Sequence, residues 1–286
     1  NADARQDVGF KEVEIIDNVL YLNGKALKIN AQNSHMQDPV NGHAVTDELI
    51  RKDFTILKRH GFNAVRTSHY PPVPRYIELA ARYGIYIIDE AGVEAHATEY
   101  VSSDERFTPM YQERVRRMVL RDRNQPAVLI WSAGNESGEG PNIGEVIKEG
   151  RKWDDTKYWM YGGNAYSHAA EDIVGPRYPT PLALDLKIGL HGDNDVRPSF
   201  MDEYISVAGN GGGMFDEMWR AIYTHERSMG GAVWDFVSPG LTQNARLLKD
   251  NSPHKVKAHI MGNAKLVTDQ RDKRNHVISL SGHDEW

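Results

Sequence analysis

Residues 46–90 read TDELIRKDFTILKRHGFNAVRTSHYPPVPRYIELAARYGIYIIDE and contain two helix-then-strand units in succession. Thr46 is a favoured N-cap, the first turn after it is acidic and the last is basic, and Gly61 ends the amphipathic pattern. A helix is therefore predicted over Thr46–His60, followed by a strand in the apolar run Phe62–Ser68. The second half of the stretch repeats the same order of helix and strand.

The rest of the chain continues this alternation. The eight apolar runs of strand length are Leu27–Asn33, Phe62–Ser68, Ile85–Glu90, Val128–Gly134, Tyr158–Gly162, Asp172–Tyr178, Ser199–Tyr204 and Gly231–Phe236. The helical patterns are Thr46–His60, Val73–Tyr83, Pro109–Arg123, Ile143–Trp153, Pro181–Ile188 and Gly213–Arg227. Such alternation predicts parallel strands joined by crossovers, and eight units in about 240 residues have the size of an α/β fold of the (β/α)₈ TIM barrel type. The alternative, an open doubly wound sheet, usually carries a Gly-rich phosphate loop after its first strand, where this chain has Asn33-Ser34-His35.

The two ends of the chain do not follow the barrel pattern. Residues 9–25 alternate like a hairpin with Asn23-Gly24 as its turn, and residues 276–286 resemble a strand that stops partway. We therefore expect three parts. Residues 1–25 would be the end of a preceding β domain with a leading hairpin, residues 26–275 the barrel, and residues 276–286 the start of a following β domain.

The composition of the 286 residues is that of a folded globular protein, with 40% hydrophobic and 26% charged residues. No apolar run approaches the roughly 18 residues of a membrane span. The net charge of −6 gives no electrostatic footprint for nucleic acid or for an anionic membrane. The absence of Cys excludes disulfides and thiol nucleophiles. Composition leaves the compartment and the oligomeric state open, with a periplasmic or extracellular location slightly favoured.

Polar residues gather where the predicted strands end, which is where TIM barrels carry their chemistry. In chain order these residues are Asn33, His35, Arg66, His69, Asp89, Glu90, Glu94, His96, Asn135, Glu136, Tyr178, Asp202, Glu203, Trp234 and Asp235. Any one of them could be an ordinary loop residue. As a set they are carboxylates, histidines, an arginine, amides and aromatics, which is not a random sample of loop residues and predicts a site.

Glu136 and Glu203 each follow a nearly pure strand pattern. A rigid strand would carry each carboxylate to the barrel mouth, where partial desolvation raises the pKa of a carboxyl group. Two carboxylates facing one substrate are what glycoside hydrolysis requires. The alternative is that they are only ion-pair partners for Arg66, His69 or Arg177.

Glu94-Ala95-His96 places two kinds of metal ligand on one side of an extended segment. A hard cation such as Mg²⁺ would accept Glu94, Glu136 and water. The alternative is that Glu94 and His96 only hydrogen-bond each other. No HExxH motif or phosphate-binding loop is present, and no organic cofactor is expected.

Five separated segments closely resemble the catalytic barrel of glycoside hydrolase family 2 and occur in the order of that family. They are FNAVRTSHYP (62–71), IIDEAGVEAHA (87–97), RDRNQPAVLIWSAGNESGEG (121–140), SFMDEYISVAGNGGG (199–213) and GGAVWDFVSPGL (230–241). The resemblance runs from about residue 9 to about residue 275. The Asn-Glu-Ser step and the VWDFV segment are more similar to the β-galactosidases of the family than to its β-glucuronidases or β-mannosidases.

By this resemblance Glu136 is the general acid/base and Glu203 is the nucleophile. Asn135 would hold the sugar 2-hydroxyl, Arg66 would pair with the nucleophile, and Tyr178 would donate a hydrogen bond near it. The resemblance also implies three residues that line the sugar subsite, namely His35, His69 and Trp234. The positions that bind Mg²⁺ in some β-galactosidases correspond to Glu94, His96 and Glu136.

One departure from the family falls on the substrate side. Many family β-galactosidases have Glu-Tyr-Ala-His at the nucleophile, and that His reaches the sugar 6-hydroxyl. Here the segment reads Glu203-Tyr204-Ile205-Ser206, so Ser206 takes the place of the His. The expected activity is that of a retaining exo-acting β-glycosidase that hydrolyses terminal β-galactosides, with C6-modified or algal galactosides as candidates.

Two other functions remain open. A β-glucuronidase of the same family is one, because Asn263-Ala264-Lys265 has the Asn-x-Lys form that such enzymes use on a uronate. A non-catalytic carbohydrate-binding barrel is the other, although it would require the loss of a carboxylate, and both are present. The expected partners are the carbohydrate substrate and the flanking β domains, one of which supplies sugar contacts in the family.

Overall fold

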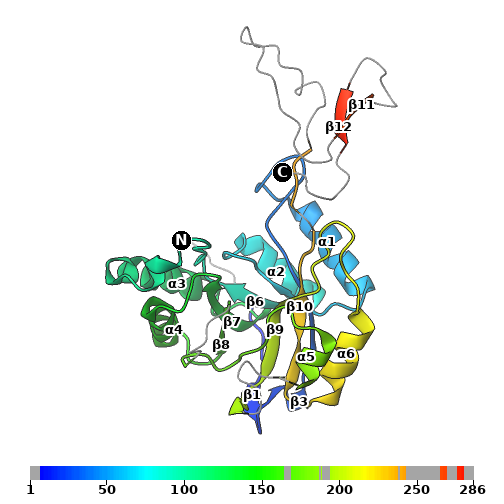
Figure 1. Cartoon of the computed structure of the whole chain (residues 1–286). Helices are drawn as coiled ribbons and strands as arrows, with labels where there is room; N and C mark the ends of the chain where they lie inside the picture. Colours follow the sequence, from blue (N-terminus) through cyan, green and yellow to red (C-terminus); the bar gives the residue numbers. More distant parts are fainter. Residues whose placement is uncertain are drawn as a thin grey trace.

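The structure is a computed structural model that describes residues 7–163, 169–186, 188, 194–237, 239–242, 265–268 and 276–279. Its centre is a seven-stranded parallel sheet in the order β8-β7-β6-β5-β4-β10-β9 (Figure 1). The strands are β4 (Ile29–Asn33), β5 (Ala64–Arg66), β6 (Tyr86–Glu90), β7 (Val128–Asn135), β8 (Tyr158–Gly162), β9 (Ser199–Tyr204) and β10 (Ser228–Val233). Because β4, the first of these strands along the chain, also pairs with β10, the last of them, the sheet wraps into a nearly closed barrel. The predicted TIM barrel class is confirmed.

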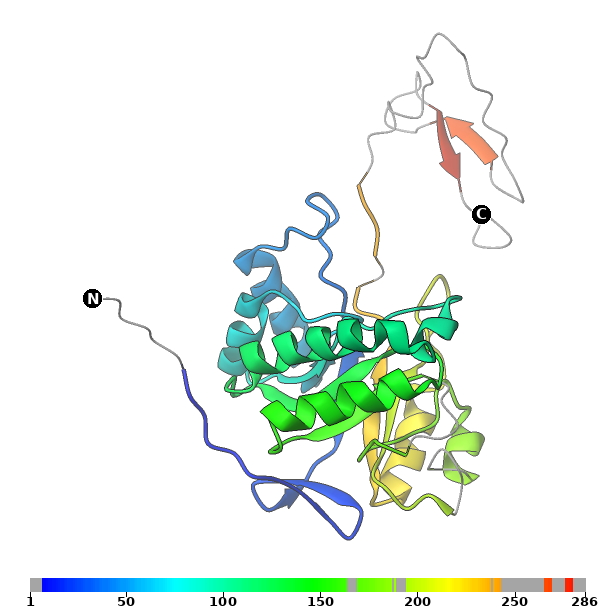
Figure 2. The ribbon, with the colours of Figure 1, turned by 90° about the vertical axis from the view of Figure 1, so that its left-hand side faces the viewer.

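Helices cover the outside of this sheet. They are α1 (Asp47–Arg59), α2 (Pro74–Tyr83), α3 (Thr108–Asp122), α4 (Pro141–Trp153), α5 (Pro181–Leu186) and α6 (Phe215–Thr224), with short 3₁₀ turns η1 (Glu99–Ser102) and η2 (Glu105–Phe107). Figure 2 shows α3 and α4 side by side across one face. The predicted cap at Thr46 is present, because its hydroxyl accepts from the Leu49 amide, and Gly84 ends α2 with φ +64°.

The sixth predicted strand, Asp172–Tyr178, is wrong as a regular strand. Its place in the wall is taken by an irregular segment that bonds to both neighbours. The Val174 carbonyl accepts from the Phe200 amide (2.8 Å), and the preceding amide donates to the Trp159 carbonyl (3.2 Å). Pro176 follows closely and has no N–H to donate to a ladder. The barrel is therefore closed here by isolated bonds, and the segment is free to carry side chains into the mouth.

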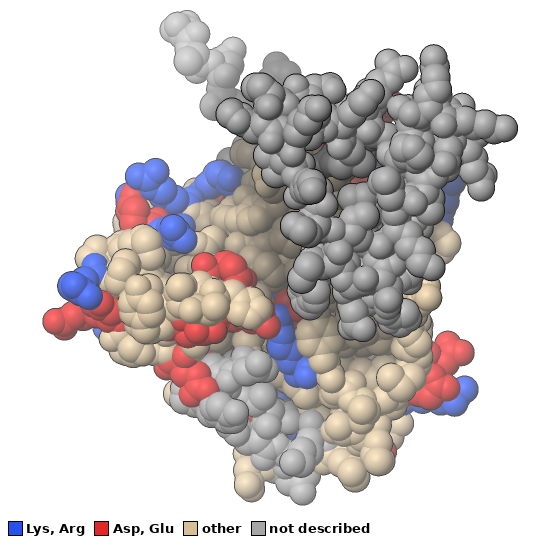
Figure 3. Space-filling view, turned by 45° about the horizontal axis from the view of Figure 1, so that its top comes forward, with Lys and Arg blue, Asp and Glu red and all other residues tan. Residues whose placement is uncertain are grey.

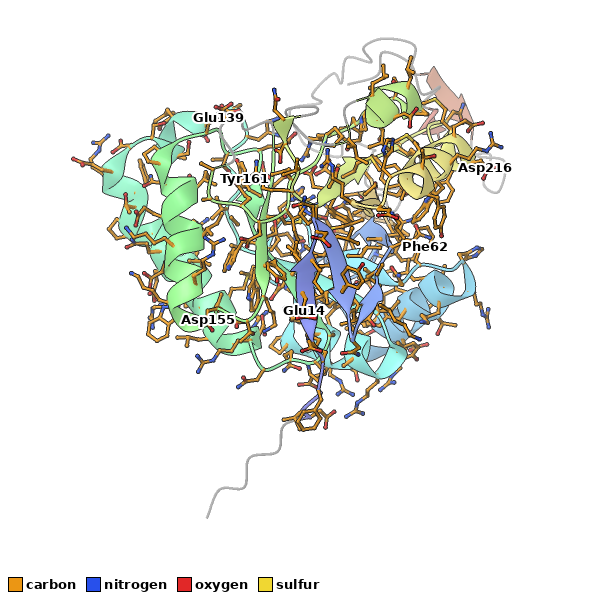
Figure 4. The ribbon with its side chains drawn as sticks, turned by 90° about the horizontal axis from the view of Figure 1, so that it is seen from below. Glu14, Phe62, Glu139, Asp155, Tyr161 and Asp216 are labelled. Atoms are coloured by element: carbon orange, nitrogen blue, oxygen red, sulfur yellow. The ribbon has the colours of Figure 1, made fainter. Side chains whose placement is uncertain are left out.

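A small antiparallel sheet lies under the barrel, formed by β1 (Val13–Ile16), β2 (Val19–Leu22) and β3 (Lys25–Ala26). The predicted turn at Asn23-Gly24 joins β2 to β3. Leu20 of β2 is fully buried with Ile29 and other apolar side chains of the barrel interior. Figure 4 shows this sheet from below across the barrel end, with Glu14 of β1 labelled. It closes the end opposite to the predicted site.

The described residues near the C-terminus form a second hairpin, in which β11 (Lys265–Thr268) pairs antiparallel with β12 (His276–Ser279). The first residues of the strand expected at 276–286 are therefore extended. Asn263 and Ala264 of the Asn-x-Lys step lie outside the described residues. Among the helices that the structure describes, none is both long and apolar enough to cross a membrane.

Candidate active site

Glu136 and Glu203 reach the same end of the barrel. Glu203 lies near the end of β9 and is almost fully buried, and Glu136 follows β7 directly with its side chain 26% exposed. Figure 3 looks at this end, where Lys or Arg side chains (blue) are exposed near the centre of the face and Asp or Glu side chains (red) lie beside them. The two carboxylates that the sequence singled out therefore share one mouth.

Arg66, at the end of β5, is the fully buried centre of the site. Its Nη1 donates to Glu203 Oε1 (3.1 Å) and to Asn33 Oδ1 (2.9 Å), and its Nη2 donates to Asn135 Oδ1 (2.8 Å). Its Nε donates to Glu90 Oε2 (2.7 Å). The planar Arg66 guanidinium, with its five N–H donors, thus connects β5 to four other strands. It also makes the expected pairing with Glu203.

Glu90, at the end of β6, is the main counter-ion of Arg66. Burial alone would raise the pKa of Glu90, but Arg66 and the hydrogen bonds from His69 and Ser132 outweigh it and hold that pKa at about 2. His69 Nδ1 lies 2.7 Å from Glu90 Oε1. Glu90 therefore stays ionised and orients both basic side chains.

A second arginine, Arg177, enters the site from the irregular segment. Its Nη2 lies 2.5 Å from Glu203 Oε1 and 3.2 Å from Glu136 Oε1. Its Nη1 donates to the buried Asp202 carboxylate and to Asn135 Oδ1 (3.1 Å). Burial lowers the pKa of Arg177, but Asp202 and Glu203 outweigh this effect and raise it, so the side chain is cationic. Glu203 therefore pairs with Arg66 and Arg177, and Glu136 pairs with Arg177, which does not by itself decide between a catalytic and a purely structural role.

Tyr178 holds the other oxygen of the nucleophile candidate. Its hydroxyl donates to Glu203 Oε2 (2.7 Å), and its backbone N–H donates to the Glu203 carbonyl (3.0 Å). Tyr178 has φ +45°, a conformation that costs a non-glycine residue free energy and that recurs at functional sites. Burial, followed by the Glu203 contact, raises the pKa of Tyr178 and keeps its proton in place.

The sugar-subsite candidates form an aromatic wall beside these charges. Trp234 stacks on His69 with ring centroids 5.2 Å apart, and His35 meets both rings edge-on. Burial, with His69 and His43 close by, lowers the pKa of His35 to about 4. A neutral imidazole and an indole offer apolar faces together with hydrogen-bonding edges, which suits a sugar ring.

The metal candidates also come together. One ligand atom from each of Glu94, His96 and Glu136 lies within 4.8 Å of the others. His96 Nδ1 is 3.0 Å from Glu136 Oε2, and Glu94 Oε2 accepts from Asn135 Nδ2 (2.8 Å). His96 Nδ1 lies 3.9 Å from Glu94 Oε1, so the alternative of a simple Glu94–His96 hydrogen bond does not describe this geometry.

Ser206 lies in the exposed loop that follows β9. The next residue, Val207, donates its backbone N–H to the Trp234 carbonyl (2.7 Å), and the Trp234 N–H donates to the Tyr204 carbonyl (3.1 Å). These bonds keep the loop next to the aromatic wall.

Asp89 belongs to the strand-end set but does not join the site. It precedes Glu90 on β6, and successive strand side chains point to opposite faces. Burial and the neighbouring Asp122 raise the pKa of Asp89 well above the ordinary value. Asp89 is therefore part of the packing between β6 and α3.

The sequence did not indicate Gly162, at the end of β8, as a site residue. A Cβ at this position would lie 2.2 Å from Arg66 Nη2 and 2.9 Å from both Asn135 Oδ1 and Asp202 Oδ2. Only glycine leaves room for this junction of charged and amide groups. Glycine at a strand end has many causes, so nothing in the sequence marked this one.

The barrel and its paired carboxylates define the class of glycoside hydrolases. Within it, the chain belongs to glycosyl hydrolases family 2, whose TIM barrel domain model matches residues 13–259. The chain is 39% identical over 248 residues to a β-galactosidase of Vibrio vulnificus (strain YJ016), covering 82% of this chain and 24% of that protein. It is 40% identical over 249 residues to a β-galactosidase of Enterobacter cloacae, covering 83% and 24%.

Among solved structures, the β-D-glucuronidase of Dictyoglomus thermophilum has a TM-score of 0.69 at 22% identity, over 84% of this chain and 49% of that chain. At that identity the likeness concerns the fold. The chain spans only 24% of the length of the curated β-galactosidases it matches.

Proposed function

We propose that the protein is a retaining exo-acting β-glycosidase that removes terminal β-galactosyl residues. One observation carries the mechanism: a single nitrogen, Arg177 Nη2, lies 2.5 Å from Glu203 Oε1 and 3.2 Å from Glu136 Oε1. These two oxygens cannot lie farther apart than the sum of the two distances. This closeness supports the carboxyl separation of about 5–5.5 Å that retaining enzymes have.

In this mechanism a Glu203 oxygen attacks the anomeric carbon while the Glu136 carboxyl group gives its proton to the departing glycosidic oxygen. The C–O bond to the aglycone breaks, and a covalent glycosyl ester forms on Glu203. Water then attacks the same carbon, Glu136 takes the water proton, and Glu203 leaves as a carboxylate. Arg66 and Tyr178 hold the two oxygens of Glu203 in place for both steps.

The amide of Asn135 is oriented for the sugar 2-hydroxyl. Its Oδ1 accepts from both Arg66 (2.8 Å) and Arg177 (3.1 Å), so its Nδ2 must point away from the two cations, toward Glu94. This arrangement offers an N–H donor beside the general acid. Hydrogen bonds to the 2-hydroxyl that strengthen in the transition state contribute to catalysis in such enzymes.

The galacto configuration of the substrate sugar is proposed because the relatives are named β-galactosidases. An altered C6 group on that sugar is proposed because Ser206 replaces the His. The loop that carries Ser206 is exposed and lies next to Trp234, so a larger C6 substituent could be placed there. Candidates are a sulfate ester, a uronate and an anhydro ring, as in algal galactans. Further β domains of a longer chain are proposed to complete the sugar contacts.

Glu94, His96 and Glu136 fit a hard cation, because two of the three supply carboxylate oxygens and Mg²⁺ usually keeps several waters. We propose that they hold Mg²⁺. When bound there, the ion would supply positive charge beside Glu136 and restrict the movement of its carboxylate.

The test is hydrolysis by the full-length protein of nitrophenyl β-galactoside, β-glucuronide and β-mannoside, with the configuration of the first-formed sugar followed by NMR. We expect the galactoside to be cleaved and the β-anomer to appear first. Cleavage of the glucuronide alone would support the β-glucuronidase alternative. An α-anomer as first product would refute retention, and hydrolysis of none of these substrates and of no C6-modified galactoside would favour the carbohydrate-binding barrel.

A further inference from the structure

Arg177 has an environment that the mechanism above does not account for. Its side chain is only 6% exposed, and each of its terminal nitrogens faces a different set of partners. Nη1 is held by Asp202 and by Asn135 Oδ1 (3.1 Å), whereas Nη2 lies between Glu203 and Glu136. Arg177 therefore has one end anchored and the other end between the two proposed catalytic carboxylates.

Asp202 is the anchor. It precedes Glu203 on β9, its side chain is about 5% exposed, and its partner Arg177 is equally enclosed. Removing two charges from water costs free energy that their attraction often does not recover, so a buried ion pair is weak evidence of a stabilising role. Burial, with Glu203 and Glu90 close by, raises the pKa of Asp202 in spite of Arg177 and Arg66, which agrees with a carboxylate held at a cost. A pair kept at such a cost next to a reaction centre calls for a functional explanation.

The charges that face the Glu203 carboxylate come from several elements. Arg66 from β5 and Arg177 from the irregular segment approach Oε1, with His69 Nε2 at 3.9 Å. Tyr178 donates to Oε2, and Asp202 precedes Glu203 where the register between β9 and β10 shifts, so that both carboxylates reach Arg177. Among the described side chains around Glu203, Arg177 and Asp202 also form an ion pair with each other.

We propose that Arg177 and Asp202 are a positioning pair that sets the positive charge felt by the nucleophile, with Arg177 adding to it and Asp202 subtracting from it. This inference rests on the roles proposed above for Glu203 and Glu136. Positive charge at Glu203 keeps it ionised and stabilises it as the leaving group of the second step. The same charge opposes any cation at the anomeric position, including the oxocarbenium-like transition state. The Asp202 carboxylate moderates that opposition.

The proposal makes the two partners act with opposite sign. Removing the Arg177 charge should favour a cationic ligand over a neutral one, and removing the Asp202 charge should disfavour it. A purely structural role would weaken both kinds of ligand together. The ratio of the two affinities therefore separates the proposal from a simple loss of folding or shape.

The experiment measures by calorimetry the affinity of the full-length protein for two sugar mimics of one configuration. One is an iminosugar with a charged nitrogen at the anomeric position, and the other is the neutral aldonolactone. In Arg177→Met the ratio should shift toward the iminosugar by about tenfold or more, because the repulsion between the guanidinium and the charged nitrogen is removed in a largely buried site. In Asp202→Asn the ratio should shift the other way, and Arg177→Lys should stay near wild type.

Arg151→Met is the matched control, because Arg151 also pairs with an aspartate, Asp172 (2.8 Å), on the outside of the barrel. It should leave the ratio unchanged. Equal losses of both ligands in Arg177→Met, or shifts of the same sign in Arg177→Met and Asp202→Asn, would overturn the proposal. The binding measurement does not depend on turnover. It is carried out once with galacto-configured mimics and once with glucurono-configured mimics. A preference for the glucurono pair would refute the proposed sugar while still testing the charge pair, and binding of neither would overturn both.

Discussion

The Tyr178 hydroxyl donates to Glu203 Oε2 across 2.7 Å, while both arginines approach Oε1 of the same carboxylate. The two oxygens of Glu203 therefore have different partners, and rotation of the carboxylate would break contacts at both. Tyr178 is placed for this contact by its unusual backbone, which is bonded to the Glu203 carbonyl. The nucleophile candidate is thus fixed from two sides.

Tyr178→Phe should lower kcat/KM on a nitrophenyl galactoside by about 10- to 100-fold, since a hydrogen bond to a charged group contributes roughly 1.5–3 kcal/mol. The ring and its contact with Arg177 are kept, so the melting temperature should change little. The measurement is steady-state kinetics with a thermal melt. Tyr223→Phe is the control, because Tyr223 is 69% exposed on α6 and should behave as wild type. Wild-type kinetics in Tyr178→Phe would show that the hydroxyl does not serve the reaction.

Glu203→Gln should abolish turnover even of an activated aryl glycoside, because an amide oxygen is a poor nucleophile, while sugar binding and the fold remain. Glu136→Gln should spare activated aryl glycosides more than natural disaccharides, because a good leaving group needs little proton donation. Kinetics of both variants on a dinitrophenyl galactoside and on a disaccharide check this. Losses of equal size on the two substrates would count against Glu136 as the acid.

The low pKa of His35 predicts that the folded state loses stability in mild acid. Burial, followed by the neighbouring His69 and His43, lowers this pKa to about 4 from 6.5. Between these two pH values, His35 is protonated in the unfolded chain but neutral in the native state. The contribution of His35 to the free energy of unfolding is therefore present above pH 6.5 and is lost as the pH falls to 4. Urea unfolding at pH 7.5, 6, 5 and 4 should show a steeper decline in wild type than in His35→Gln. His60→Gln, at an exposed position, should keep the wild-type slope. Equal slopes in all three proteins would contradict the assignment.

Much of the barrel could be predicted from the sequence, because amphipathic helices and apolar strands have different periods and because Thr46 and Gly84 mark helix ends chemically. The Asp172–Tyr178 segment has strand-like composition but bonds only at isolated points, and composition does not report the hydrogen-bond pattern. Arg177 was noted only as an ion-pair partner. Its place between Glu136 and Glu203 depends on how that irregular segment crosses the mouth, which is a tertiary property.

Exhaustive chelation should lower activity on nitrophenyl galactoside by about tenfold, and Mg²⁺ should restore it. The reason is that Glu136, His96 and Glu94 would otherwise be free to adopt other positions at the exposed edge of the site. Glu94→Gln should weaken the response to Mg²⁺, with activity titrated against added metal. Glu99→Gln, at the first residue of the 3₁₀ turn η1 in the same loop, is the control. Full activity after chelation would make Glu94 and His96 structural residues only.

The last prediction concerns the C6 group of the sugar and depends on Ser206. The family resemblance implies that many β-galactosidases have at this position a His that reaches the 6-hydroxyl, and Ser is several heavy atoms smaller. A hydroxyl group left without its partner costs roughly 1–3 kcal/mol, so simple aryl galactosides should be turned over with low efficiency. The loop that carries Ser206 is exposed and is bonded to the Trp234 backbone through Val207, which keeps it next to the aromatic wall.

Ser206→His should therefore raise kcat/KM on unmodified galactoside by about tenfold and lower it on a galactoside with a sulfate ester or an anhydro ring at C6. The ratio of the two activities is the quantity to measure, because a general disturbance of the loop would lower both. Ser206→Asn, which adds bulk and hydrogen-bonding groups without an imidazole, separates the filling of space from the specific donor. If the ratio stays at its wild-type value in Ser206→His, position 206 does not contact C6, and the preference for a modified galactoside must come from another part of the protein.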